Sequence, residues 1–335
     1  MSTTNDNASG DSEEITSNKK ECTSCEQKNI DNITEGINCS VAILDNDVSM
    51  CACCGKEGNS EDMNACNKCK MVKYCNAACK KKHRTKHKKA CERRVAELHE
   101  EQLFKDVEPE ECPICFLPLP VADKQSFKLC CGKRMCNGCL YAMYISSGKD
   151  LCAFCRTPEY ISDEEIIERM KKLMDKGNGE AFNNLAMMYD DGTHGLPQDV
   201  QRANVLYLKS GELGCASGYY NLGNSYNIGT GVELDKKKAI YYWELAAIKG
   251  FVEARYNLGC REALDGNVER AIKHWLIAAR AGDETSLYNV KAGFTKGIVT
   301  KNEYASTLRA YHERQKEMKS DERDKAAASG LFGRA

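Results

Sequence analysis

Closely spaced cysteine pairs between residues 112 and 155 constrain the fold of this chain more than any other feature. The segment contains eight cysteines in four pairs: Cys112 and Cys115, Cys130 and Cys131, Cys136 and Cys139, and Cys152 and Cys155. Thiolates are preferred ligands of tetrahedral zinc, and a two-residue gap lets both sulfurs of a pair reach one ion. The pairs therefore predict two zinc sites of four cysteines each. We call residues 110–158 the all-cysteine module.

The spacing of these pairs resembles that of a RING finger. The resemblance implies that the first and third pairs bind one zinc ion, and that the second and fourth pairs bind the other. In most RING fingers, a histidine ligand follows the third zinc-binding cysteine by two residues. Counted from Cys131, that position in this chain is Lys133. Cys130, directly before Cys131, would replace that ligand, as in the all-cysteine RING variant. The alternative is a zinc knuckle that only stabilises the fold.

A second group of zinc-ligand residues lies in residues 49–92, which we call the histidine-containing module. Its eight members are Cys51, Cys54, Cys66, Cys69, Cys75, Cys79, His87 and Cys91. The members of each of the last two pairs are separated by three residues, which places both ligands of a pair on one face of a helix. Eight ligands again predict two tetrahedral sites, so that the chain would bind four structural zinc ions.

This ligand series resembles a MYND finger. The resemblance implies one zinc site of Cys51, Cys54, Cys75 and Cys79, and another of Cys66, Cys69, His87 and Cys91. Cys53 is interpreted as a bystander thiol. MYND fingers mostly bind short proline-containing peptides. They usually have Gln directly after the sixth cysteine ligand, which is Cys79 here, and Trp four residues after that Gln. This chain has Lys80 and Arg84 at those positions, which places the peptide groove in question.

Residues 80–94 are strongly basic and contain no interleaved aromatic residues. Such a run is typical of a nuclear-localisation signal or a phosphate-binding patch, or of the solvated face of a helix. We favour the solvated face. Since no interleaved aromatic residues offer stacking for nucleic-acid bases, we do not expect sequence-specific recognition of nucleic acid. A helical linker, residues 93–109, is predicted to follow.

Composition narrows the class of protein. The net charge is −1. The sequence has no run of some 18 apolar residues and no apolar N-terminal segment, so we expect neither a membrane span nor a signal peptide. The 21 cysteines then indicate metal binding in a reducing compartment, cytoplasmic or nuclear. Residues 1–48 are polar and predict a disordered tail, in which Cys22 and Cys25 lack the second pair that a zinc site needs.

After the all-cysteine module, a two-helix pattern recurs over residues 160–320. Leu185, Leu222 and Leu258 mark successive copies, at intervals of 37 and 36 residues. Such a period predicts an all-α solenoid, and the copy that begins near Gly218 resembles Sel1-like repeats. We expect about four repeats after a half repeat, glycines that end the second helices at Gly214 and Gly250, and a charged tail over 321–335.

The sequence shows no hydrolytic or redox site, so any activity depends on what the modules bind. The RING resemblance implies a ubiquitin ligase that positions a conjugating enzyme through Ile114, Met143, Phe154 and Arg156. The repeats, with the MYND-like module as a further candidate, would recruit substrate. Met143 stands where the family usually has Trp. The alternatives are a non-catalytic protein-interaction scaffold and a nuclear, transcription-associated regulator that uses the basic helix. Protein partners are expected, with neither membrane nor nucleic acid.

Overall fold

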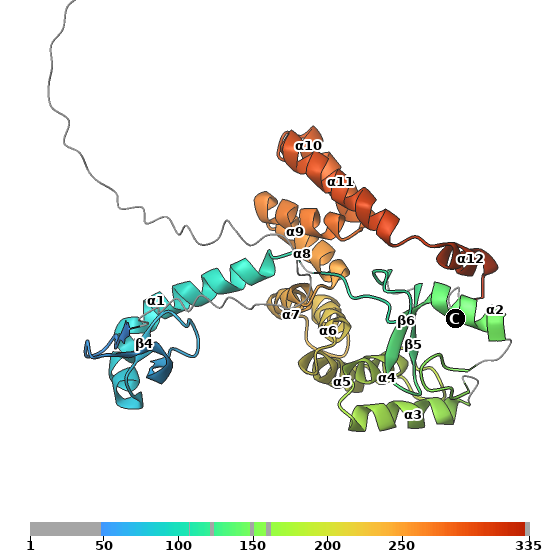
Figure 1. Ribbon diagram of the computed structural model, residues 1–335, viewed down its shortest axis with the longest axis horizontal. Helices are drawn as coiled ribbons and strands as arrows, with labels where there is room; N and C mark the ends of the chain where they lie inside the picture. The colour runs from blue at the N-terminus through green and yellow to red at the C-terminus, as the bar shows by residue number, and fades with distance from the viewer. Residues whose placement is uncertain (1–47, 107, 121–123, 148–150, 159–161, 332–335) are drawn as a thin grey trace, which may run out of the picture.

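The computed structural model describes residues 48–106, 108–120, 124–147, 151–158 and 162–331. Two small cysteine-rich modules are joined to an arc of helices (Figure 1). The histidine-containing module projects from the arc at the far end of α1, whereas the all-cysteine module lies against it. The predicted tail over residues 1–48, with Cys22 and Cys25, lies outside the described residues except for its last position.

The histidine-containing module consists of two short hairpins and the start of a long helix. Strand β1 (Val48–Met50) pairs with β2 (Glu57–Asn59), a 3-10 turn covers Ser60–Asp62, and β3 (Asn64–Ala65) pairs with β4 (Lys73–Tyr74). Helix α1 (Ala77–Leu103) has 27 residues. The predicted separate linker helix is therefore the second half of α1, because no glycine or proline interrupts the helix-forming sequence.

The all-cysteine module contains one antiparallel hairpin and one helix. Strand β5 (Gln125–Lys128) pairs with β6 (Lys133–Cys136), and α2 (Asn137–Ser147) follows directly. Its buried core residues are Cys112, Met135, Cys136 and Leu140. So few buried side chains cannot stabilise a module of this size alone, and metal binding would supply the rest.

Nine helices between residues 163 and 317 build the repeat region. They are α3 (Asp163–Asp175), α4 (Gly179–Asp191), α5 (Val200–Glu212), α6 (Ala216–Ile228), α7 (Lys236–Ile248), α8 (Val252–Leu264), α9 (Val268–Arg280), α10 (Glu284–Thr295) and α11 (Lys301–Glu317). Helices α4 to α9 pack as three successive pairs, with α3 before them and α10 and α11 after them. Gly214 and Gly250 have φ angles of 102° and 90°, as expected for glycines that end helices.

Small residues in the repeats allow close contact with tryptophan. A Cβ atom added at Gly223 of α6 would lie 2.5 Å from Cδ1 of Trp243 in α7. Gly259 of α8 meets Trp275 of α9 in the same way. The Leu-Gly step of the repeat therefore combines a buried leucine with a position where only glycine admits the tryptophan of the next helix.

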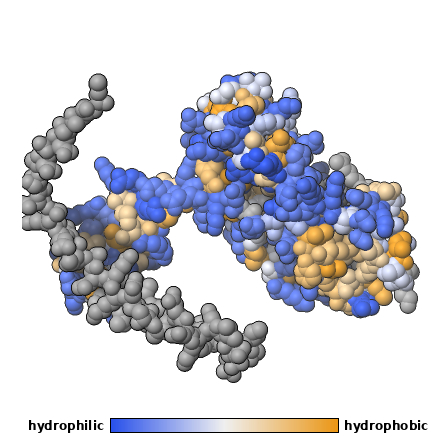
Figure 2. All heavy atoms as spheres, turned by 45° about the horizontal axis from the view of Figure 1, so that its top comes forward, coloured by the Kyte–Doolittle hydropathy of each residue, from blue (hydrophilic) through white to orange (hydrophobic). Residues whose placement is uncertain are grey.

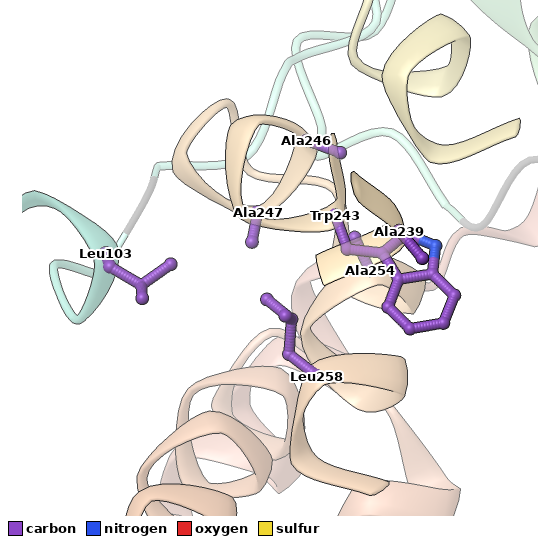
Figure 3. Packing of buried hydrophobic residues seen from close by; sticks show 7 residues of the cluster. All are labelled: Leu103, Ala239, Trp243, Ala246, Ala247, Ala254 and Leu258. Carbon is purple, nitrogen blue, oxygen red and sulfur yellow. The ribbon is translucent and has the colours of Figure 1, made fainter. Parts of the chain in front are cut away.

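The end of α1 is buried in the repeat region. Leu103 is fully buried and packs in one cluster with Ala247 of α7 and Leu258 of α8 (Figure 3). Phe104 follows and packs against His274 of α9, with ring centroids 4.7 Å apart. The linker is therefore part of the hydrophobic core of the repeats, which fixes the direction in which α1 leaves them.

The all-cysteine module is attached to both ends of the repeat region (Figure 1). At the first end, Arg134 forms an ion pair with Glu180, and Asn178 Nδ2 donates to the Gly132 carbonyl at 3.3 Å. At the other end, helix α12 (Asp321–Ser329) packs against α2. The prediction that residues 321–335 form only a charged tail is wrong, because residues 321–329 are helical and Ala326 is buried.

Candidate metal centres

The histidine-containing module brings its eight predicted ligands together as two sets of four. Within each set, the ligand atoms all lie within 4.8 Å of one another: Cys51, Cys54, Cys75 and Cys79 in the first set, and Cys66, Cys69, His87 and Cys91 in the second. The sulfurs of Cys54 and Cys75 are 3.7 Å apart. Four sulfurs placed tetrahedrally at about 2.3 Å from a zinc ion are separated by about 3.8 Å. The spacing therefore fits a zinc ion and is too long for a disulfide.

The elements of this module fix the ligands in place. Asn76 caps α1 by accepting a hydrogen bond from the backbone N–H of Cys79 at 2.8 Å. This cap starts the helix where Cys79 faces Cys75, and the same helix carries His87 and Cys91 two and three turns later. Cys53, the expected bystander, belongs to neither set.

The all-cysteine module forms two further sets, which interleave along the chain. One set contains Cys112, Cys115, Cys136 and Cys139, and the other contains Cys130, Cys131, Cys152 and Cys155. The sulfurs of Cys115 and Cys136 are 3.8 Å apart, and those of Cys131 and Cys152 are 3.7 Å apart. The adjacent pair Cys130–Cys131 thus reaches the same set, whereas the ammonium nitrogen of Lys133 lies 5.0 Å from the ring centroid of Phe154. Both sets have the donor type and the spacing that zinc requires.

One thiol in each set has a lowered pKa. Hydrogen bonds from the backbone of Cys75 and Cys54 lower the pKa of Cys51 to about 6. The hydroxyl of Thr157 does the same for Cys155, whose pKa is also about 6. Burial alone would raise the pKa of Cys66 and Cys112, but backbone N–H groups lower these values to about 6 and about 7. Each set therefore begins with one thiolate that is stabilised by the fold.

Seven other ligand thiols show the opposite effect, a raised pKa: Cys75, Cys79, Cys91, Cys130, Cys131, Cys136 and Cys139. Burial and the neighbouring Cys136 raise the pKa of Cys139, and burial and Cys66 raise that of Cys91 to about 11. Closely packed thiolates repel one another, so the second and later protons of a set are held tightly. A divalent cation removes this repulsion, which is why such a set binds zinc in place of protons. Each set would fill all four positions of a tetrahedral ion and leave none for a substrate.

Comparisons with known proteins agree with this description. The MYND finger family model matches residues 51–91, and the Sel1 repeat family model matches residues 180–215, 216–251 and 252–283. The chain contains a MYND finger and Sel1 repeats. Helices α10 and α11 extend the Sel1 repeats by a further pair beyond the matched residues.

Three solved structures are similar to the chain. A Sel1 repeat protein from Oxalobacter formigenes has a TM-score of 0.41 and 23% identity, covering 53% of this chain and 71% of that one. Helicobacter pylori cysteine rich protein B has a TM-score of 0.27 and 24% identity, with coverages of 28% and 70%. A protective antigen of uropathogenic Escherichia coli has a TM-score of 0.36 and 22% identity, with coverages of 58% and 44%.

The four predicted partner-binding residues lie in the all-cysteine module, and their side chains differ in exposure to solvent. Ile114 is 40% exposed, and Arg156 is exposed directly after Cys155 with a φ angle of 62°. Met143 and Phe154 are partly buried and pack against the same core cluster. Figure 2 shows apolar residues on the side of the molecule where the all-cysteine module and α12 lie. Within the described residues, no helix is long and apolar enough to span a bilayer.

One residue beside the thiols of the all-cysteine module was not found from the sequence. Arg323 of α12 donates hydrogen bonds to the carbonyls of Pro118 at 2.9 Å and Met318 at 2.8 Å, and its Nη2 lies 3.6 Å from the sulfur of Cys115. Its guanidinium therefore places a positive charge beside a cluster of thiols from more than 200 residues away. The charged sequence around Arg323 carries no motif that predicts this contact.

Proposed function

We propose that the all-cysteine module is a RING finger and that this chain is a RING-type ubiquitin ligase. The zinc finger and the Sel1 repeats make the chain a protein-interaction scaffold, and the proposal assigns a specific task to that scaffold. The interleaving of the two cysteine sets supports it most, because pairs one and three, and pairs two and four, lie together. This cross-bracing joins both zinc loops into one rigid surface.

A RING finger does not need a reactive group of its own. It acts by holding a conjugating enzyme and its bound ubiquitin in a reactive arrangement, which is catalysis by positioning. Ile114 would supply exposed apolar surface for docking, and the partly buried Met143 and Phe154 would add to that surface. Arg156 would donate hydrogen bonds to both enzyme and ubiquitin, for which its planar five-donor head is well suited.

The attachment of the module to the repeats supports a ligase with fixed geometry. Arg134 with Glu180 on one side and α12 on the other hold the all-cysteine module against the Sel1 repeats. The loops between repeats face the module across a cavity of about 270 Å³, which both parts line. A substrate recruited by the repeats or by the MYND finger would therefore be held at a defined distance from the conjugating enzyme.

Autoubiquitination with a panel of conjugating enzymes tests the proposal. Ile114→Ala should weaken binding of the conjugating enzyme by about 1–2 kcal/mol, because it removes apolar contact area. Arg156→Ala should leave that binding nearly unchanged and lower ubiquitin transfer. Ile298→Ala and Arg309→Ala are matched controls, since both side chains are exposed on the repeats. Equal activity of all four variants would contradict the proposed roles.

The second candidate is a non-catalytic scaffold. Met143 and Ala153 occupy positions where RING fingers usually have Trp and Pro, and both replacements reduce the apolar docking surface. In this case, the four zinc ions would only stabilise interaction surfaces. Wild-type protein that stays inactive with every conjugating enzyme tested, while its zinc content and fold are intact, would favour the scaffold.

A further inference from the structure

We propose that the MYND finger binds an acidic peptide segment of a partner protein in a cationic groove between α1 and the zinc knuckle at residues 66–69. The groove has a volume of about 650 Å³. It does not involve the all-cysteine module, so this assignment is independent of ligase activity. The cations along its walls, which form no ion pair with a carboxylate among the described residues, point to an anionic ligand.

One face of α1 forms the longer wall of the groove. The lining residues of this helix recur at the spacing of a single helical face: Ala77, Lys80, Lys81, Arg84, Thr85, Lys88, Cys91 and Glu92. Asn67 and Lys68 form the opposite wall, and the buried side chains of Tyr74 and His87 form the floor. The result is a channel with four cations on the α1 side, Lys80, Lys81, Arg84 and Lys88, and one cation, Lys68, on the opposite side.

Within the described residues, the cations of this channel form no ion pair with a carboxylate, although Glu92 is one of the lining residues. Lys80 donates to the amide oxygen of Asn67 at 2.9 Å, which is an uncharged acceptor. No ion pair joins Lys81, Arg84 or Lys88 to a carboxylate in the described part of the chain, and the ion pairs of α1 begin only at Arg93. Like charges one helical turn apart destabilise a helix, so an anionic ligand in the channel would relieve this repulsion.

The channel fits a peptide better than a nucleic acid. Among the described residues of the MYND finger, the large exposed apolar side chains are aliphatic or thioether, and Tyr74 is only 1% exposed. Bases of single-stranded nucleic acids stack on exposed aromatic rings, which this surface does not offer. The same lack of an exposed ring disfavours a neutral proline-rich peptide. Carboxylates spaced along an extended chain match cations spaced along one helical face.

Two double variants of α1 provide a matched test. Arg84→Glu with Lys88→Glu reverses charges inside the channel, whereas Lys82→Glu with Lys86→Glu makes the same change in net charge on positions outside it. All four side chains are exposed, so both variants should keep the zinc content and thermal stability of the wild type. The probe is a fluorescein-labelled peptide of alternating glutamate and alanine, titrated with the zinc-loaded full-length chain and followed by anisotropy.

The expected result is a loss confined to one variant. The channel variant should bind the peptide about tenfold more weakly or worse, which corresponds to about 1.4 kcal/mol. The variant outside the channel should lose less than about threefold, because only screened long-range attraction changes. A peptide with glutamine in place of glutamate should not bind, and affinity for the acidic peptide should fall as salt is raised.

Four outcomes would overturn the proposal. Equal losses in both double variants would indicate diffuse attraction without a channel. Equal binding of the glutamine peptide or of a neutral proline-rich peptide would exclude acidic recognition. Single-stranded RNA that binds more tightly than the peptide would assign the cations to nucleic acid. Tighter peptide binding after removal of residues 1–18, whose charged side chains are Asp6, Asp11, Glu13 and Glu14, would make the occupant the chain's own acidic segment.

Discussion

Arg255 of α8 donates a hydrogen bond to the carbonyl oxygen of Leu103, the last residue of α1, at 2.5 Å and across 152 positions of sequence. A second nitrogen of the same guanidinium donates to the carbonyl of Lys105 at 3.0 Å. Arg255 is only 2% exposed, and burial lowers its pKa to about 10. A cation at the C-terminal end of a helix satisfies carbonyls that have no partner within the helix and interacts favourably with the helix dipole.

Replacing Arg255 should therefore release the MYND finger from the Sel1 repeats. In Arg255→Met, the buried carbonyl of Leu103 and the carbonyl of Lys105 lose their donor, and we expect a destabilisation of about 2–4 kcal/mol. Cleavage by a protease between residues 103 and 110 should become faster. Arg261→Met on the same helix removes only a solvent-screened pair with Asp265 and should change stability much less than Arg255→Met. Similar proteolysis of both variants would show that Arg255 does not hold the linker.

Zinc content is the second prediction. The four ligand sets predict four zinc ions per chain, measurable by elemental analysis of protein purified with zinc present. Cys136→Ser should lower the value by one or two ions and unfold the all-cysteine module, because metal binding and folding are coupled. Cys53→Ser is the matched control and should leave the value unchanged. A reproducible value of two in the wild type would remove one whole module from the zinc assignment.

The third prediction concerns the contact between α12 and the all-cysteine module. Arg323→Ala removes donors to the carbonyls of Pro118 and Met318, so α12 should detach and a chelator should extract zinc faster from this module. Gly138→Ala should act similarly, since the added Cβ would lie 2.6 Å from Cγ of Arg323. Lys325→Ala, an exposed change on the same helix, should not alter zinc release. Unchanged release in all three variants would argue against a stabilising role for α12.

The fourth prediction is a pH dependence that originates at His274. Burial lowers the pKa of His274 to about 3, and the nearby Arg255 and Arg270 add to the effect. The unfolded chain therefore takes up a proton near pH 6.5, whereas the folded chain does not, so stability falls as the pH decreases from about 6.5 towards 3. Between pH 7 and pH 5, this one residue should cost about 2 kcal/mol.

Urea unfolding at these two pH values, followed by circular dichroism, isolates the contribution. His274→Leu keeps a buried side chain beside Phe104 and removes the titrating group and two buried nitrogens without hydrogen-bond partners. Its loss of stability between pH 7 and pH 5 should be smaller than that of the wild type by about 2 kcal/mol. An identical pH dependence of the two proteins would show that His274 does not control this transition.

The sequence alone determined the local features of this protein. The gaps between cysteines are short enough that chain geometry brings each pair to one ion. Which pairs share an ion came from the resemblance to RING and MYND fingers. The repeat period did the same for the helices, because Leu185, Leu222 and Leu258 face equivalent neighbours in successive units. Such signals depend on interactions between residues that are close in sequence or related by the repeat.

Only the tertiary structure decided how the modules are placed. The burial of Leu103 among α7 and α8, its carbonyl bound by Arg255, and the contact of Arg323 with the all-cysteine module all join residues more than 140 positions apart. In the sequence, Leu103, Arg255 and Arg323 have no feature that distinguishes them from other helix residues, and no pattern assigns a role to His274. Their roles follow from which surfaces meet after folding, and no spacing along the chain encodes that geometry.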